Sequence, residues 1–213
     1  MELEIIGAPQ SNFVRAVRMV CEEKSVAYTL TPLRPRTPAV EAIHPLGKIP
    51  VMRHGDFTLC ESKAIALYID RSFAGPRLFP DDVKAAAEVE QWVSLCNVSL
   101  MPMIRGYVFR YFFPTGTDGK SDRAVIEAAI PDMQKALAIL DKAVAETGFL
   151  AGDSFTYADV NLLPVLAYMQ DCPESKEALW GLGNLTAYFE KHSVRSSFAK
   201  TVPPPFSQLR QAS

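Results

Sequence analysis

The sequence predicts two domains, an N-terminal α+β domain followed by an all-helical domain. Two observations support this division. Short β-prone runs are almost confined to the first 60 residues, and apolar residues beyond them recur mainly at helical spacing. A Pro-, Gly- and acid-rich segment at residues 74–82 is typical of a linker. We therefore expect a first domain at 1–76, a linker at 77–83 and a second domain at 84–213.

The first domain begins with a strand, a helix and a second strand. Residues 2–6 are β-prone and end at the turn-like Gly7-Ala8-Pro9. Residues 11–24 have apolar side chains at helical spacing, and residues 28–33 are again typical of a strand. The two strands are parallel if the helix between them is a crossover connection.

A proline-rich bridge follows and leads to a hairpin and a helix. Three prolines between residues 32 and 38 interrupt any regular pattern. Residues 49–53 and 57–60 are short strands joined by a His-Gly-Asp turn, which is a hairpin signal, and residues 62–72 predict a helix. The order is therefore β-α-β, the bridge, then β-β-α.

The second domain is predicted to be helical, with an extended tail from Thr201. Pro102, Pro131 and Pro164 fall inside the expected helices and should kink or break them, because proline removes a backbone donor. The main helices are expected at about 83–112, 122–147, 156–170 and 183–192.

Composition excludes several classes of function. The 22 basic and 24 acidic residues nearly balance, and no basic run is long enough for a nucleic-acid or membrane patch. The N-terminus lacks the features of a secretory signal and no apolar run is long enough to span a bilayer, so we expect the cytoplasm. The cysteines and histidines are scattered without metal-ligand spacing, so neither a disulfide framework nor a metal site is expected. The four cysteines are Cys21, Cys60, Cys96 and Cys172.

The segment from His44 to Val51 (HPLGKIPV) is the most informative motif. Ile-Pro directly before a strand predicts a cis peptide bond at Pro50. Such a turn leaves the backbone N–H and C=O of Ile49 at a sheet edge, where an extended peptide can pair with them. An ordinary rigid turn is the alternative interpretation.

Glu61 and Ser62 stand where the last strand stops and a helix begins. Ser62 can cap the helix, and free N–H groups at a helix start can bind a carboxylate. Glu61 offers a partner for an ammonium group. Together they suit an α-amino acid terminus, whereas capping alone explains Ser62 but not Glu61.

Ser11 lies at the turn between the first strand and the first helix. Capping is the simpler interpretation. A hydroxyl in the positive field of a helix N-terminus also stabilises a thiolate, which is the reactive form of a thiol. No cysteine occupies this turn, so the thiol would come from a ligand.

With these motifs the chain resembles the cytosolic glutathione transferases over nearly its whole length. The matching segments are Gly7 to Val17, Pro45 to Pro50, Glu61 to Ile65, Gln91-Trp92 and Phe149 to Asp159. The resemblance implies a thioredoxin-like first domain (β-α-β-α-β-β-α) and a helical-bundle second domain. It is nearest to serine-type members, phi-like and related bacterial forms, because the first Tyr is Tyr28 and the activating position is Ser11. Thr156 and Asp159 match the family's N-capping box, which is structural.

The resemblance also implies the roles of the site residues. Ser11 would be the catalytic residue and would bond the glutathione sulfur. Glutathione would be a co-substrate, with no prosthetic group, and the chain would form a homodimer. Lys48 and, more weakly, Arg36 would meet a ligand carboxylate, while His44 has no assigned role. The implied glutathione-binding residues are Ser11, Arg36, Lys48, Ile49, Pro50, Glu61 and Ser62.

The second substrate is expected to be a small hydrophobic electrophile between Ser11 and the helix after the linker. One ridge of that helix is purely apolar, and its simplest interpretation is that it belongs to the hydrophobic core. This ridge comprises Leu100, Ile104, Val108 and Phe112. A neighbouring ridge has softer or amphipathic groups that suit a pocket wall, although such stripes are more often core. The expected pocket residues are Phe13, Met103, Tyr107 and Tyr111.

The function implied is that of a glutathione S-transferase (EC 2.5.1.18), in which the thiolate attacks the electrophile. Two alternatives stay open. The same fold carries glutathione-dependent isomerases, dehalogenases and ether-cleaving enzymes. The second alternative is a non-catalytic glutathione-binding or scaffolding module. The complete set of Ser11, Glu61 and Ser62 argues against this alternative.

Overall fold

A computed structural model describes residues 2–114 and 121–206 of the chain. These residues form two compact units. The first runs up to Phe79 and takes in the chain again from Ser193, and the second covers Pro80–His192. Within the described ranges, no helix has the length and hydropathy needed to cross a membrane.

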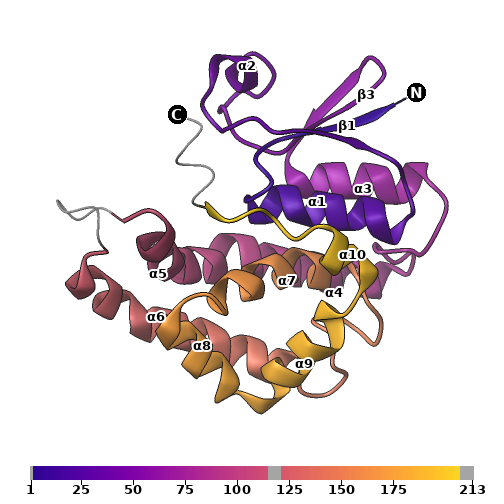
Figure 1. Cartoon of the computed structure of the whole chain (residues 1–213). Helices are drawn as coiled ribbons and strands as arrows, with labels where there is room; N and C mark the ends of the chain where they lie inside the picture. The colour runs from indigo at the N-terminus through magenta and orange to yellow at the C-terminus, as the bar shows by residue number, and fades with distance from the viewer. Residues whose placement is uncertain (1, 115–120, 207–213) are drawn as a thin grey trace. The chain divides into compact units, whose positions relative to one another are not determined.

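The first unit is built on a four-stranded sheet with the order β2-β1-β3-β4 (Figure 1). Strands β1 (Leu3–Ile6) and β2 (Thr29–Thr31) are parallel, which confirms that the intervening helix is a crossover. Strands β3 (Val51–His54) and β4 (Phe57–Cys60) form the expected antiparallel hairpin, and β3 pairs with β1.

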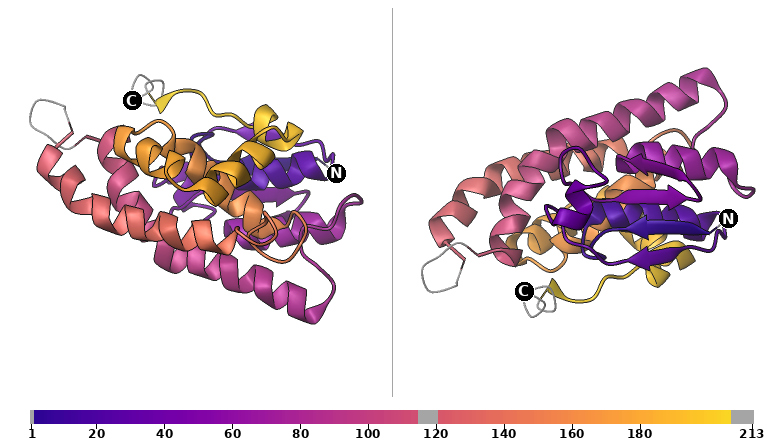
Figure 2. Two further views of the ribbon diagram at one scale, coloured as in Figure 1. Left: turned by 90° about the horizontal axis from the view of Figure 1, so that it is seen from below. Right: turned by 90° about the horizontal axis from the view of Figure 1, so that it is seen from above.

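Two helices cover one face of this sheet (Figure 2). Helices α1 (Asn12–Glu23) and α3 (Ser62–Ser72) pack against each other and against the strands. Their apolar stripes are fully buried, because one face of each helix is turned to the sheet. The proline-rich bridge contains the short helix α2 (Pro38–Glu41), with Pro38 at its first turn. The thioredoxin-like order expected from the resemblance is therefore confirmed.

The chain returns to this unit after residue 193. Helix α10 (Ser196–Lys200) packs on α1. The guanidinium of Arg195 donates two hydrogen bonds, of 2.8 and 2.7 Å, to the carboxylate of Glu23 near the end of α1. We expected this segment in the helical domain; instead the Arg195–Glu23 pair and the packing of α10 join it to the first unit.

A buried ammonium group fixes the ends of α1 and α3. Lys24 is 5% exposed, and its Nζ donates to the carbonyl oxygen of Asp70 at 3.0 Å and to the carboxylate of Asp70 at 3.2 Å. The same Nζ donates to the carbonyl of Pro76, where the chain leaves α3. A buried charge is stable only when it is paired and hydrogen-bonded, and Lys24 meets this condition at the beginning of the linker.

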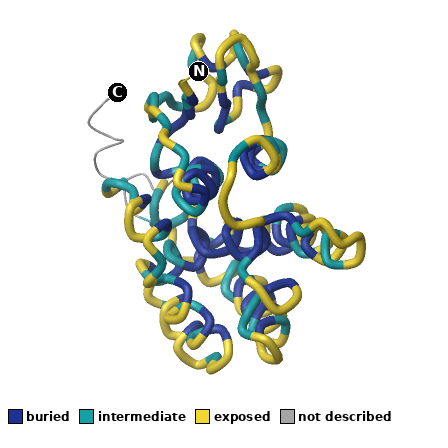
Figure 3. The backbone as a smooth tube through the Cα atoms, turned by 90° about the vertical axis from the view of Figure 1, so that its right-hand side faces the viewer, coloured by how far each residue is buried: buried dark blue, intermediate teal, exposed yellow. Residues whose placement is uncertain are grey.

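The second unit is entirely helical in its described part. Figure 3 shows that buried residues gather on the inner sides of its helices and exposed residues on the outer turns. Helix α7 is buried on nearly every residue, as expected for a helix that is apolar all round. The helices are α4 (Val83–Ser94), α5 (Met101–Phe112), α6 (Arg123–Ala143), α7 (Tyr157–Met169), α8 (Pro173–Trp180) and α9 (Gly183–Ser193).

A π-helical segment, η1 (Leu95–Leu100), joins α4 to α5 within the expected helix 83–112. Pro102 lacks an N–H, so the carbonyl of Val98 loses its normal i+4 donor and the helix widens immediately before the proline. The N–H of Met101 bonds the carbonyl of Cys96, which is the π spacing. Pro131 and Pro164 do not break their helices, because α6 and α7 continue through them.

Asp159 is the polar centre of the helical unit. It is completely buried, and its carboxylate accepts from the N–H of Leu150 at 2.8 Å, the N–H of Thr156 at 2.9 Å and the hydroxyl of Tyr188 at 2.9 Å. Thr156 and Asp159 form the reciprocal capping box at the start of α7 that the sequence predicts. One carboxylate thereby joins the 150s loop, α7 and α9.

Removing this carboxylate should destabilise the helical unit. We expect Asp159→Ala to lower the free energy of unfolding by about 3 kcal/mol, because it leaves buried donors without an acceptor. Thr156→Ala should cost about 1 kcal/mol as a lost cap. Urea denaturation measures both, with the exposed Asp153→Ala as the matched control. A loss for Asp159→Ala no larger than for Asp153→Ala would contradict this account.

Candidate functional site

Ser11 is the N-cap of α1, as the sequence predicts. Its backbone is extended (φ −71°, ψ 126°), and its Oγ accepts a long hydrogen bond of 3.4 Å from the N–H of Val14. Its own N–H donates to the carbonyl of Ala8 at 3.0 Å. Within the described residues its hydroxyl hydrogen has no acceptor, so the half-buried hydroxyl can donate to a ligand at the positive end of the helix.

Gly7 brings the loop before β3 against the first turn of α1. A Cβ at Gly7 would lie 2.6 Å from Cγ2 of Val14 and 3.1 Å from Cβ of Ile49. Real Cβ atoms essentially never approach another atom as closely as the first distance. Only glycine therefore lets Ile49 pack beside the turn that ends at Ser11.

The Ile49–Pro50 peptide bond is cis, which confirms the prediction from the Ile-Pro-Val sequence. Pro50 is buried and Ile49 is half-buried directly before β3. Across the described part of the chain, the backbone N–H and C=O of Ile49 have no hydrogen-bond partner. This residue thus presents a free donor and a free acceptor beside the Ser11 turn.

Glu61 and Ser62 begin helix α3, but in a different way from the one expected. Glu61, not Ser62, occupies the N-cap position, and no side chain caps this helix. Glu61 has a φ of 71°, a conformation that non-glycine residues adopt at a cost of about 1–3 kcal/mol. Capping by Ser62 is therefore ruled out as the explanation of this motif. The helix start remains available to an anion.

His44 approaches Glu61, although the sequence suggested no role for it. Its side chain is 3% exposed, and its Nε2 lies 3.9 Å from Oε1 of Glu61. Its Nδ1 accepts from the N–H of Leu46 at 3.0 Å. The loop that supplies Ile49 is thus also connected to the beginning of α3.

The two basic candidates lie on adjoining stretches of backbone. Arg36 has a φ of 61°, and its N–H donates to the carbonyl of Gly47 at 2.7 Å, immediately before Lys48. Both side chains are exposed. The structure therefore brings Arg36 to the same loop as Lys48, which the distance between them in the sequence does not indicate.

The expected electrophile residues belong to different units. Phe13 is half-buried on the first turn of α1, and the other three lie on α5. Tyr107 is completely buried, because its ring packs inside the helical unit. In the apolar ridge beside it Leu100, Ile104 and Val108 are buried and Phe112 is half-buried. Of the expected residues on α5, an open pocket could therefore meet only Met103 and Tyr111, both half-buried.

Glu174 holds the hydroxyls of both tyrosines. Tyr107 donates to its Oε2 at 2.7 Å, and Tyr111 donates to the same oxygen. Arg123, at the start of α6, forms an ion pair with Oε1. Burial opposes ionisation of this carboxyl, but the hydrogen bonds from Tyr111, Tyr107 and Arg123 outweigh it and lower its pKa to about 2. No motif marked Glu174, because its partners are distant in the sequence.

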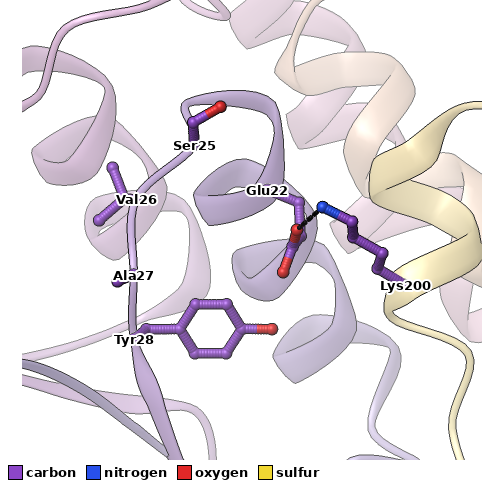
Figure 4. Close-up of a pocket in the computed structure, with 6 residues that line it drawn as sticks. All are labelled: Glu22, Ser25, Val26, Ala27, Tyr28 and Lys200. Atoms are coloured by element: carbon purple, nitrogen blue, oxygen red, sulfur yellow. Dashed lines mark ion pairs between the residues drawn. The ribbon is translucent and has the colours of Figure 1, made fainter.

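A separate hollow of about 450 Å³ lies elsewhere on the first unit (Figure 4). The carboxylate of Glu22 and the ammonium of Lys200 face each other across it at 3.2 Å. None of the expected glutathione-binding residues lines this hollow. Its lining consists of Glu22, Ser25, Val26, Ala27, Tyr28 and Lys200.

Three of the chain's four thiols are not activated. Cys21, Cys96 and Cys172 are buried, and burial raises the pKa of each thiol to about 12. The described residues contain no group of three or more His, Cys, Asp or Glu that could hold a metal ion. No cysteine occupies the Ser11 turn, so a thiol that reacts there would come from a ligand.

Comparison with known families gives two matches in chain order. Residues 5–77 match the model of the N-terminal domain of glutathione S-transferases. Residues 123–191 match the model of their C-terminal domain. The first match contains Ser11, the Ile49–Pro50 turn and Glu61-Ser62, so the expected glutathione-binding residues fall within it.

Individual proteins agree with these matches. Glutathione S-transferase 3 of Zea mays is 32% identical over 96% of this chain and 98% of its own length. The structure of glutathione transferase F7 from Populus trichocarpa matches with a TM-score of 0.85 and 28% identity, over 93% of this chain and 97% of that one. A glutathione S-transferase from Methylobacillus flagellatus, solved with glutathione bound, matches with a TM-score of 0.78 and 25% identity, over 95% of this chain and all of that one.

Adding a methyl group at Gly7 should disturb the site. We expect Gly7→Ala to lower the free energy of unfolding by about 2–4 kcal/mol, because its Cβ would clash with Val14 and push Ile49 away. Gly106→Ala is the matched control, since a Cβ there meets nothing within 4 Å and alanine favours a helix. Equal unfolding midpoints in urea for the two variants would contradict the close approach.

The Glu174 network predicts a stability that depends on pH. The folded pKa of about 2 lies below the ordinary value of 4.5, so the stabilisation is present above about pH 4.5 and is lost as the pH falls toward 2. Glu174→Gln should thus destabilise the protein more at about pH 6 than at about pH 3. Thermal unfolding measures the difference, with the exposed Glu177→Gln on the same helix as the matched control.

Proposed function

Because the chain belongs to the glutathione S-transferase family, we propose that its first unit binds glutathione with the thiol beside Ser11. The chain is accordingly a transferase (EC 2.5.1.18) with glutathione as its co-substrate. The observation that carries the assignment of Ser11 is its unused hydroxyl hydrogen at the N-terminus of α1, next to the free backbone groups of Ile49.

Ser11 activates the thiol by stabilising the thiolate. Its O–H donates a hydrogen bond to the sulfur, and the helix N-terminus adds a favourable partial positive charge. A thiol with a pKa near 8.5 is only a few per cent ionised at neutral pH, and a decrease of about two units makes the thiolate the major form. The proton leaves to solvent as the thiolate forms.

The rest of glutathione is held by the neighbouring groups. Ile49 pairs its free N–H and C=O with the cysteinyl backbone beside Pro50. Glu61 binds the α-ammonium of the γ-glutamyl end, and the uncapped start of α3 at Ser62 binds its carboxylate. Lys48 and Arg36 supply positive charge for the glycine carboxylate. The solved relative from Methylobacillus flagellatus has glutathione bound, which supports this ligand.

In the transfer step the thiolate attacks an electrophilic carbon of a small hydrophobic substrate. A sulfur–carbon bond forms, and the leaving group departs with the electron pair of the bond that breaks. We propose Phe13 of the first unit and Met103 and Tyr111 of the helical unit as residues that contact this substrate, whereas Tyr107 is completely buried within the helical unit. The hydroxyls of both tyrosines are already donated to Glu174, so their contribution is the ring surface.

The proposal also includes the compartment and the oligomeric state of the enzyme. We propose a cytoplasmic homodimer, as the family resemblance implies. Light scattering at several concentrations tests the dimer. Isomerase, dehalogenase and ether-cleaving activities use the same activated thiolate and are separated by assaying each substrate class.

Substitution of Ser11 tests the mechanism. We expect Ser11→Ala to reduce kcat for an aryl halide by about 10²-fold or more, because thiolate stabilisation is lost. Ser11→Asp should cap α1 as well as serine does and be equally inactive, since an ionised carboxylate cannot donate to the sulfur and repels the thiolate. Steady-state kinetics and the ultraviolet absorbance of bound thiolate are the measurements. Full activity in either variant would remove Ser11 from the mechanism.

A further inference from the structure

His44 directs one specific N–H group toward Glu61. Because its Nδ1 accepts the N–H of Leu46 at 3.0 Å, the proton of the neutral ring is on Nε2. That Nε2 lies 3.9 Å from Oε1 of Glu61. The imidazole is 3% exposed, whereas the Glu61 side chain is 70% exposed. A buried donor therefore faces an exposed carboxylate.

The backbone on both sides holds this arrangement in place. The N–H of His44 donates to the carbonyl of Val40 at 2.9 Å, and its carbonyl accepts from the N–H of Gly47 at 2.9 Å. Glu61 is held at a φ of 71°, and its carbonyl accepts from the N–H of Ile65 in the first turn of α3. These hydrogen bonds fix the backbone of both residues.

We propose that His44 is a positioning residue for Glu61 in glutathione binding. Its Nε2–H attracts one carboxylate oxygen toward the loop and leaves the other for the α-ammonium of the γ-glutamyl group. An exposed glutamate loses rotamer freedom when it binds a ligand, and orientation in advance reduces that loss. This inference rests on the proposed function, because it requires that Glu61 binds the ammonium group.

Two substitutions separate this role from that of a simple turn residue. In His44→Asn the Oδ1 replaces Nδ1 as the acceptor for Leu46, but nothing replaces Nε2–H. In His44→Gln the amide nitrogen can replace Nε2–H, but the local acceptor is lost. A positioning role therefore predicts that glutamine preserves binding and asparagine does not, and a turn role predicts the reverse.

The experiment titrates the full chain with glutathione and with an analogue that lacks the α-amino group. We expect His44→Asn to bind glutathione about threefold to fivefold more weakly than the wild type, the size typical of a partly exposed polar pair. His44→Gln should bind like the wild type. Neither variant should differ from the wild type with the analogue. Unchanged glutathione binding in His44→Asn, or an equal loss with the analogue, would overturn the proposal.

Further measurements distinguish a loss of positioning from a change in folding. In a Glu61→Ala background, His44→Asn should have no additional effect on affinity if His44 acts through Glu61. His54→Asn is the histidine control, because its Nδ1 pairs with the hydroxyl of Tyr68 at 2.8 Å. Absence of glutathione binding in the wild type would overturn the proposed function itself, whereas normal wild-type binding with an unaffected His44→Asn overturns only the positioning role.

Discussion

The close approach at Gly7 is the constraint on which the N-terminal site depends. The strand β1 delivers the chain to this residue, and the absence of a side chain lets Ile49 lie against Val14 in the first turn of α1. Two segments nearly 40 positions apart thereby share one small space. The hydroxyl of Ser11 and the free backbone groups of Ile49 become neighbours because Ile49 and the first turn of α1 both pack against Gly7.

Buried polar groups also hold backbone segments together within each unit. Lys24 binds the ends of α1 and α3 through buried hydrogen bonds, and Asp159 joins α7 to α9 and to the loop before it. Each of these groups makes several hydrogen bonds, so each fixes several backbone segments at once. Glu174 has the same function for α5, α6 and α8. Each unit thus contains at least one polar residue that holds several of its backbone segments together.

Most of the fold and part of the site could be predicted from the residues, and the division has a physical basis. Strands, helices, the cis bond at Pro50 and the Thr156–Asp159 box arise from neighbours in sequence, where spacing carries the information. His44 and Glu174 could not be assigned, because their partners are determined by tertiary packing. The π-helix before Pro102 also escaped prediction, since proline there widens the helix instead of ending it.

The N-cap of α3 is a single residue that the sequence alone does not predict correctly. A serine at a helix start is usually a cap, yet here Glu61 occupies that position in a left-handed conformation. Local statistics favour the simple interpretation, and only the backbone angles exclude it. Rare conformations of this kind are found where a ligand or a neighbour determines the chain's path.

The burial of three cysteines affects how the protein reacts with disulfides. Disulfide exchange requires a thiolate, and a pKa of about 12 leaves only about one thiol in 10⁵ ionised at neutral pH. Oxidised glutathione arriving at the chain would thus find Cys21, Cys96 and Cys172 inert. An enzyme that activates its ligand's sulfur while keeping these three of its own protonated avoids forming mixed disulfides with its substrate at those positions.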